Sequence, residues 1–425
     1  MKKLLTLLVV AVLAITCCFS LVGCGKPVAG LICLHGESST YDKNFIDAFK
    51  TACDNKGVEY VIATDIEEDD ACYNKAAEFV DSGCKVIFAD SFGHEQYMIK
   101  AAKEFTDVEF CHATGTQAKQ DSTPANYHNA FASIYEGRYI AGYAAGLKLN
   151  TMKDKADTNK NFKVGYVGAY TYAEVVSGLT SWFLGVQAAL DTGYTATMEV
   201  QFTGSWYDET AEKTAAETLI SRGAVLVSQH ADSMGAPTAC DVAGVPNVSY
   251  NGTTGKNSNV AYSKINWVPY FEYMLDNYVE HKIATDYCGT IADGSVVADV
   301  ATAAVDGTAT KLEEIKNKIN NGEIKIFDCS KFTVKNNTMV IDNVIYQSQK
   351  QQDGSYLNVA VGTTDADGHI LTYKADVDGD YVGDTNVIKT SGTTTYFDES
   401  NATAFRSAPY FDLQIDGITF LNVKF

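Results

Sequence analysis

From Val28 onward, short apolar runs rich in β-branched residues alternate with segments whose apolar residues recur at helical spacing. The first apolar runs are predicted to be buried strands, because they are short and bounded by polar turns. They cover residues 28–34, 58–63, 86–89 and 108–111. Residues 42–56 carry apolar side chains on one face of a 3.6-residue repeat. Strands that alternate with helices form a parallel sheet covered on both faces, so the chain is predicted to have an α/β fold.

The same pattern starts again after residue 161, which predicts a second unit of similar design. Its expected strands are 162–167, 197–202, 225–228 and 248–250, with a helix over 208–222. A longer helix is expected over 135–149, followed by a lysine-rich linker or exposed turn over 150–161. We therefore expect two doubly wound lobes, with residues 24–150 and about 268–328 in the first and residues 151–267 in the second. Residues 329–425 change to short β-like runs and are predicted to form a mostly β C-terminal extension.

The N-terminus has the features of a bacterial signal peptide over residues 1–23. Lys2 and Lys3 precede an apolar run over 4–15 that is short for a membrane-spanning helix. The run is followed by Leu-Val-Gly-Cys at 21–24, which resembles the lipobox of lipoproteins and implies lipid attachment at Cys24. The alternative is an ordinary signal peptide with an incidental cysteine. Because two acyl chains anchor a protein firmly, we expect an extracytoplasmic protein tethered to the cell membrane.

Charge and cysteine usage exclude several classes of function. The formal net charge of -20 argues against nucleic acid as a partner, because nothing balances a phosphate backbone. Eight cysteines follow Cys24 without C-x-x-C spacing, and several lie in apolar runs, so buried free thiols are expected rather than a zinc site. The acidic segment 376–380 lacks the remaining EF-hand positions and is interpreted as a turn. No catalytic motif is complete, and neither a metal nor a cofactor is predicted.

Aromatic and polar residues follow successive predicted strands, where ligands bind in sheets of this kind. Flat rings beside carboxylate, amide and hydroxyl groups suit a planar heteroaromatic ligand, which the rings would stack against while a carboxylate accepts its hydrogen bonds. Several of these residues have a structural alternative: Trp206 could be a packed surface residue, and for Tyr41 and Phe92 both readings stay open. Asp232 could cap the next helix, His230 could be structural, and Asn251 could mark a turn. The candidate ligand-binding residues are Tyr41, Ser91, Phe92, Trp206, His230, Asp232, Ser233 and Asn251.

Several segments in order along the chain carry a family resemblance. The segment Tyr-Glu-Gly-Arg-Tyr-Ile-Ala-Gly at 135–142 resembles a characteristic stretch of the basic membrane protein family, the substrate-binding lipoproteins of ABC transporters that include purine nucleoside receptors. The further matching segments are 89–93, 112–115, 165–168, 202–206, 229–233, 266–270 and 324–327. The resemblance covers roughly residues 28–329. It implies a type I periplasmic-binding fold with the ligand clamped between two lobes.

The resemblance also implies a function and partners. Tyr41 and Trp206 correspond to the rings that stack on a purine, and Asp232 to the carboxylate that contacts the base or ribose. The first-loop aspartate of nucleoside receptors has no obvious counterpart, which leaves nucleobase and nucleoside both open. The expected role is capture of a purine for an ABC permease and its ATPase subunits, without catalysis. The alternatives are a binding protein for another solute, such as a sugar or signalling molecule, and a surface nucleoside hydrolase that uses Asp232 and His230.

Overall fold

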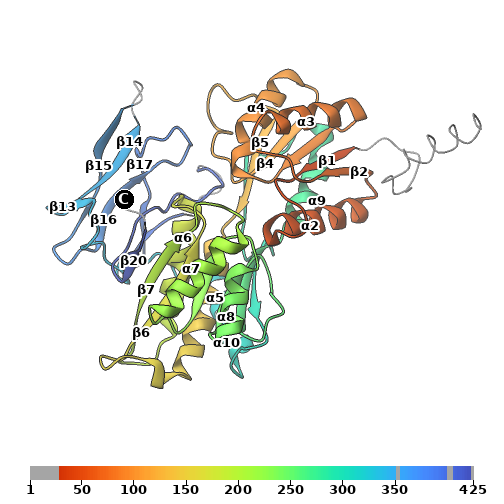
Figure 1. Cartoon of the computed structure of the whole chain (residues 1–425). Coiled ribbons are helices and arrows are strands. Elements are labelled where there is room, and N and C mark those ends of the chain that lie inside the picture. The colour runs from red at the N-terminus through yellow and green to blue at the C-terminus, as the bar shows by residue number, and fades with distance from the viewer. Residues whose placement is uncertain (1–27, 351–354, 400–404, 423–425) are drawn as a thin grey trace, which may run out of the picture.

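The computed structural model describes residues 28–350, 355–399 and 405–422; the predicted signal peptide and Cys24 lie outside them. Two lobes, each built around a largely parallel sheet, lie next to each other, and the C-terminal extension lies alongside both (Figure 1). The predicted α/β architecture and the mostly β extension are confirmed. No helix in the described part of the chain is long and apolar enough to cross a membrane.

The first lobe contains a six-stranded, fully parallel sheet in the order β11-β5-β4-β3-β1-β2. Its central strands β1, β3, β4 and β5 are buried throughout, as expected of a sheet covered on both faces, whereas the edge strands β2 and β11 are partly exposed. The strands are β1 (Ala29–Ile32), β2 (Tyr60–Ala63), β3 (Val86–Ala89), β4 (Glu109–Ala113), β5 (Tyr127–Ala132) and β11 (Asp286–Gly289). The helices are α2 (Thr40–Lys56), α3 (Asp70–Ser82), α4 (Glu95–Glu104) and α9 (Val268–Asn277).

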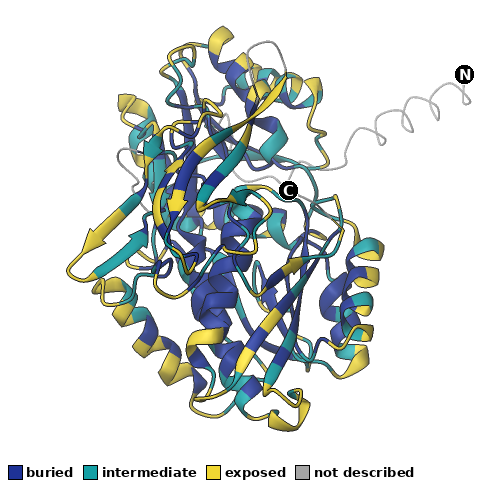
Figure 2. Cartoon of the chain, turned by 90° about the vertical axis from the view of Figure 1, so that its left-hand side faces the viewer, coloured by how far each residue is buried: buried dark blue, intermediate teal, exposed yellow. Residues whose placement is uncertain are grey.

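The second lobe contains a seven-stranded sheet in the order β12-β10-β9-β8-β6-β7-β20, in which only β12 runs antiparallel to its neighbour. The strands are β6 (Asn161–Gly168), β7 (Thr195–Phe202), β8 (Val227–His230), β9 (Asn247–Tyr250), β10 (Asn259–Ile265), β12 (Val296–Val300) and β20 (Ile418–Phe420). The helices are α5 (Ile134–Asn150), α6 (Ala173–Ala189), α7 (Glu209–Ser221), α8 (Gly235–Ala243) and α10 (Thr308–Asn320). Buried strands occupy the interior, and the outer helices expose their solvent faces (Figure 2).

The helix α5 packs in the second lobe, although the sequence analysis places it in the first. Its glycines allow the backbone of α6 to come into direct contact with the backbone of α5. A Cβ on Gly142 would lie 2.0 Å from the carbonyl oxygen of Trp182. Likewise, a Cβ on Gly185 of α6 would lie 2.1 Å from the carbonyl oxygen of Tyr139. The chain therefore crosses between lobes near Ser133, and the segment 150–161 is an exposed turn within the second lobe. The strand β12 and the helix α10, placed in the first lobe by the sequence, also join the second.

The C-terminal extension contains an antiparallel sheet and a hairpin, and it contacts both lobes. The sheet consists of β13 (Val340–Ile341), β14 (Val344–Lys350), β15 (Tyr356–Thr364), β16 (Ile370–Ala375) and β17 (Thr385–Asn386), and the hairpin of β18 (Ile388–Ser391) and β19 (Thr394–Phe397). Asp286 of the first lobe accepts hydrogen bonds of 2.9 Å from the backbone N–H and the hydroxyl of Ser407. Glu399 accepts a 2.5 Å hydrogen bond from Ser177 of α6, and β20 pairs with β7. The extension therefore bridges the two lobes.

All eight cysteines in the described residues are free, as predicted. Seven are buried, and Cys288 is half-buried. Burial raises the pKa of these thiols; for example, it raises the pKa of Cys53 to about 12. They therefore act as small apolar side chains in the core rather than as reactive groups.

Candidate functional site

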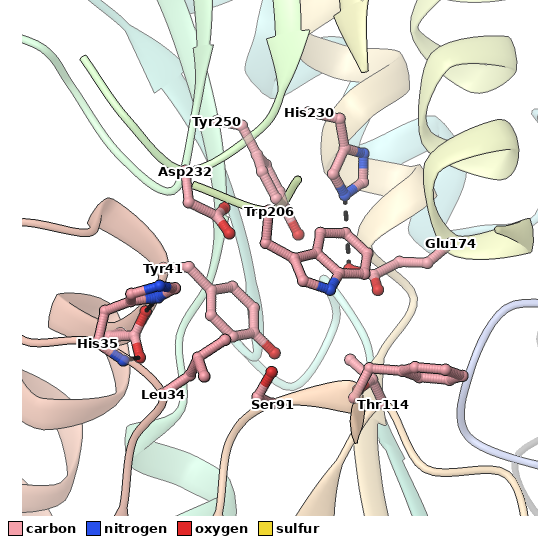
Figure 3. Close-up of a pocket in the computed structure, with 12 residues that line it drawn as sticks. Leu34, His35, Tyr41, Ser91, Thr114, Glu174, Trp206, His230, Asp232 and Tyr250 are labelled. Carbon is pink, nitrogen blue, oxygen red and sulfur yellow. Dashed lines mark hydrogen bonds and ion pairs between the residues drawn. The ribbon is translucent and has the colours of Figure 1, made fainter. Parts of the chain in front are cut away.

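A small pocket lies between the lobes, beyond the carboxyl ends of the strands of both sheets (Figure 3). We call it the inner pocket. From the first lobe it receives residues that follow β1, β3 and β4, and from the second lobe residues that follow or end β7, β8 and β9, with one from α6. Its lining residues are Leu34, His35, Tyr41, Asp42, Ser91, Phe92, Thr114, Glu174, Trp206, His230, Asp232 and Tyr250.

Aromatic rings from both lobes border the inner pocket. The Tyr41 hydroxyl donates a 2.8 Å hydrogen bond to the backbone carbonyl of Asp90, which fixes its ring in the first lobe. Trp206 packs edge-on against Tyr170, with ring centroids 5.1 Å apart. The Tyr250 ring lies 4.3 Å from the His230 ring. Figure 3 shows Tyr41, Trp206 and Tyr250 around one space, with the Asp232 carboxylate at its edge.

Asp232 is the buried carboxylate of the second lobe at this site. Burial raises its pKa well above the usual range, and the negative charges of Asp42 and Glu212 add to the effect. Its carboxylate accepts a long hydrogen bond, 3.3 Å, from the Asn251 amide to Oδ1. It does not cap α8, whose N-terminal residue Met234 has no side-chain cap. A ligand donor that reached this carboxylate would favour its charged form.

A second acidic group lies at the first-lobe side. Ser39 begins α2 and donates a 2.5 Å hydrogen bond to Asp42, which also accepts one of 2.7 Å from the His35 N–H. Burial alone would raise the pKa of Asp42, but its hydrogen bonds with His35 and Ser39 hold it below the usual range. Neighbouring Asp90 is fully buried, and desolvation raises its pKa well above the usual range. The two carboxyls are thus shifted in opposite directions, which favours the charged form of Asp42 and the neutral form of Asp90.

A buried arginine underlies the second-lobe half of the pocket. Arg138 of α5 is fully buried and donates hydrogen bonds to Tyr166, Ser228 and the backbone carbonyl of Gln229. Its guanidinium also lies 5.3 Å from the centre of the Tyr250 ring. Glu136 of the same helix accepts a 2.8 Å hydrogen bond from the Ile291 N–H in the crossover. Arg138 therefore positions β8 and Tyr250 rather than its own helix.

His230 is held as a neutral ring. Burial lowers its pKa, although Glu174 lies 3.5 Å from its Nε2 atom and opposes the shift. Gly178 leaves room for the imidazole, since a Cβ there would lie 2.7 Å from Nδ1. Glu174 belongs to the first turn of α6, so the sequence argument based on strand ends did not find it.

The lobes are in contact in this structure, and the inner pocket is nearly filled. Phe92 of the first lobe stacks on Tyr172 of the second, with ring centroids 5.1 Å apart. The enclosed volume is about 20 Å³, room for roughly one water molecule. A ligand larger than this requires the lobes to separate or the side chains that fill the pocket to move, followed by closure around it.

The structure brings six of the eight predicted site residues to the inner pocket: Tyr41, Ser91, Phe92, Trp206, His230 and Asp232. Two do not line it. The hydroxyl of Ser233 accepts a hydrogen bond from the Gly235 N–H, and its own backbone N–H faces Glu212. Asn251 has a left-handed backbone, with φ at 60°, and reaches the pocket only through Asp232. The residues that the sequence argument missed are Leu34, His35, Asp42, Thr114, Glu174 and Tyr250.

One buried group has the composition of a metal site. Ligand atoms of Cys33, Asp42 and Asp90 lie within 4.8 Å of one another. However, burial raises the pKa of the Cys33 thiol and of Asp90 well above their usual ranges, which disfavours the charged forms that bind metal ions. Protonated ligands bind metal ions poorly, and the hydrogen bonds of Asp42 already satisfy its charge.

Two lobes that enclose a pocket at their strand ends define the type I solute-binding class. The fold is similar to that of a solute-binding protein from Aeropyrum pernix K1, with a TM-score of 0.57 and 15% identity over 70% of this chain and 93% of that one. It is also similar to a solute-binding protein from Conexibacter woesei DSM 14684, with a TM-score of 0.54 and 18% identity over 70% and 98% of the two chains. At these identities the likeness concerns the fold alone.

Residues 35–330 match the family model Bmp, described as ABC transporter substrate-binding protein PnrA-like. The chain belongs to this family of extracytoplasmic substrate-binding proteins. It is 36% identical over 155 residues to the purine-binding protein BAB2_0673 of Brucella abortus (strain 2308), which is 36% of this chain and 39% of that protein. It is 28% identical over 249 residues to the putative ABC transporter glucose-binding protein TsgA13 of Haloferax volcanii, 56% and 59% of the two chains. The matches thus span well under two thirds of either relative, and the extension lies almost wholly outside the family model.

Proposed function

We propose that this protein captures a purine nucleobase or nucleoside between its lobes and delivers it to an ABC permease. The observation that carries the proposal is the arrangement of the inner pocket, in which Tyr41 and Trp206 approach from opposite lobes and the Asp232 carboxylate lies at the edge of the space they border. Aromatic rings offer stacking surfaces to a planar heterocycle. A buried carboxylate accepts hydrogen bonds from its ring N–H or amino groups. The purine-binding relative supports the same ligand class.

The electrostatics of the pocket favour a ligand rich in donors. Asp42, Glu174 and Asp232 all line it, whereas the Arg138 guanidinium beneath it is already engaged by Tyr166 and Ser228. An anionic ligand would meet like charge at several sides. A neutral purine base or nucleoside offers N–H and O–H donors without this penalty.

Delivery to a permease requires a binding protein that is anchored to the membrane and whose lobes can open and close. We infer that Cys24 carries the lipid anchor and that the hinge consists of the three crossovers near Ser133, Trp267 and residues 290–295. At the second crossover, Trp267 is buried and stacks on Phe45 at 4.4 Å, which holds the hinge end of α9 against the first lobe. The permease and ATPase subunits would recognise the closed form.

A second candidate is a sugar, as in the name of the glucose-binding relative. Isothermal titration calorimetry of the chain lacking residues 1–23 separates the purine from the sugar candidate. The ligands to titrate are adenine, guanine, hypoxanthine, their ribonucleosides and glucose. Saturable one-to-one binding of a purine supports the proposal. Binding of glucose in the inner pocket without any purine contradicts it and favours the second candidate. Free hypoxanthine after incubation with inosine would instead indicate hydrolysis.

A further inference from the structure

A larger cavity lies between the C-terminal extension and both lobes, directly outside the inner pocket. We call it the outer chamber. Its volume is about 540 Å³, within the range of small-molecule binding sites. It shares Phe92, Thr114, Glu174 and Trp206 with the inner pocket, so the two cavities meet at these residues. Most of its remaining wall comes from the extension.

The polar groups of the outer chamber are already oriented by one another. Asp412 accepts a 2.5 Å hydrogen bond from the Gln347 amide and one of 2.6 Å from the Tyr373 hydroxyl. Arg406 donates a 2.8 Å hydrogen bond to Asp376 and one of 2.9 Å to the carbonyl of Pro409. Gln347, Asp376, Arg406 and Asp412 all line the chamber. A ligand would therefore meet fixed donors and acceptors, which lowers the entropy lost on binding.

Aromatic rings supply the apolar part of the same wall. Tyr172 and Tyr381 line the chamber, and they remain 45% and 61% exposed although both are large. Phe92 and Trp206 add two more rings from the lobes. Exposed aromatic rings beside oriented carboxylate, amide and guanidinium groups suit a molecule that has both apolar faces and many hydroxyls.

The charges of the chamber select against anions. Glu174, Asp376 and Asp412 line it with a single guanidinium, that of Arg406, which is paired with Asp376. A phosphorylated ligand would meet more negative than positive charge, whereas a neutral polyol would not.

From these observations we infer that the outer chamber is a second binding site, made by the C-terminal extension, for a neutral hydroxyl-rich molecule of the saccharide class. The inference does not depend on what the inner pocket binds. The extension would thereby add a second binding site, outside the two-lobed core of the family and next to the inner pocket. It would widen the range of solutes that one binding protein carries.

The test is ligand-observed saturation-transfer NMR on the chain lacking residues 1–23, followed by calorimetry of any hit. The probes are glucose, galactose, xylose, maltose and lactose. Glucose 6-phosphate is the anionic comparison ligand. At least one neutral saccharide is expected to bind, and glucose 6-phosphate to bind at least tenfold more weakly than glucose. No binding by any neutral saccharide, or equal binding of the phosphate ester, overturns the inference.

Two variants assign the binding to the chamber. Ser348→Trp fills it from β14 and is expected to weaken saccharide binding at least tenfold; Leu371→Trp, on an exposed position of the same sheet that does not line the chamber, should leave it unchanged. Tyr381→Ala removes an exposed ring of the chamber wall and is expected to weaken binding several-fold. Saccharide binding that both chamber variants retain overturns the inference. Purine binding that survives Ser348→Trp keeps the two proposals separate, since the inner pocket is then intact.

Discussion

The backbone carbonyl of Asp232 in the second lobe accepts two hydrogen bonds from Thr40 at the start of α2 in the first lobe. The backbone N–H donates at 2.9 Å and the hydroxyl at 3.0 Å. The residue whose carboxylate faces the inner pocket is thus also the residue that joins the lobes. This pairing couples closure of the lobes to the geometry of the inner pocket, because both depend on the position of the loop that carries Asp232.

Thr40→Val should loosen the closed form. The substitution keeps the side-chain shape and the backbone hydrogen bond but removes the hydroxyl donor, which contributes about 1 kcal/mol. Because the closed form binds the ligand, we expect roughly a fivefold loss of affinity by calorimetry and a larger radius of gyration by X-ray scattering. Thr51→Val is the matched control, since its hydroxyl bonds only to Asp47 within α2. Equal affinities of the two variants would show that this contact does not stabilise closure.

The close packing of α5 on α6 predicts a strong effect of a single methyl group. Gly142→Ala places a Cβ 2.0 Å from the Trp182 carbonyl oxygen, so the helices must separate. We expect a loss of about 1–3 kcal/mol in the free energy of unfolding, measured by denaturant titration. Gly36→Ala serves as the control because the nearest atom to its Cβ would be 4.0 Å away. A Gly142→Ala variant as stable as the control would contradict the packing described.

The buried carboxyl of Glu399 predicts a specific pH dependence of stability. Burial raises its pKa to about 7, even though Ser177 and two backbone N–H groups donate hydrogen bonds to it. The unfolded chain has a lower pKa, about 4.3. Between these values the folded state holds the proton more tightly, so the contribution of Glu399 to stability falls as the pH rises from about 4.5 to 7.

Glu399→Gln removes this titration. Relative to the unmodified chain, the variant should gain stability between pH 5 and pH 8, by an amount on the order of 2–3 kcal/mol, with thermal unfolding as the measurement. Glu313→Gln, at an exposed position of α10, should show no such trend. A melting-temperature difference for Glu399→Gln that is constant with pH would mean that this carboxyl is already ionised in the folded protein.

Much of the sheet architecture was predictable because buried parallel strands are continuous apolar runs. The predicted strand 86–89 coincides with β3, and the predicted helix 135–149 differs from α5 by one residue at each end. The strand β5 escaped prediction because His128 and Asn129 interrupt its apolar pattern. Inside the fold His128 pairs with Glu109 of the adjacent strand, so a polar residue is buried with its partner.

The lobe boundaries were less predictable, because they depend on which sheet a helix packs against. The glycines of α5 carry that information, but their partners on α6 are known only from the fold. Similarly, residues at strand ends could be listed from the sequence, whereas Glu174 comes from a helix and Asp42 from a capping position. Ser233 follows Asp232 in the chain but is turned toward Glu212. Position after a strand end therefore selected two residues, Ser233 and Asn251, that do not line the inner pocket, and it missed six that do.

The proposed function requires the inner pocket to bind a purine through Trp206 and Asp232. This can be measured by calorimetry with adenine, guanine, hypoxanthine and their ribonucleosides. The proteins compared are the unmodified chain, Trp206→Ala, Asp232→Asn and the control Tyr73→Ala. Tyr73 is an aromatic residue on α3, outside the inner pocket. We expect saturable binding of at least one purine, weakened at least tenfold by Trp206→Ala and by Asp232→Asn but not by Tyr73→Ala. Absence of binding by every purine, or binding that neither pocket variant weakens, would contradict it.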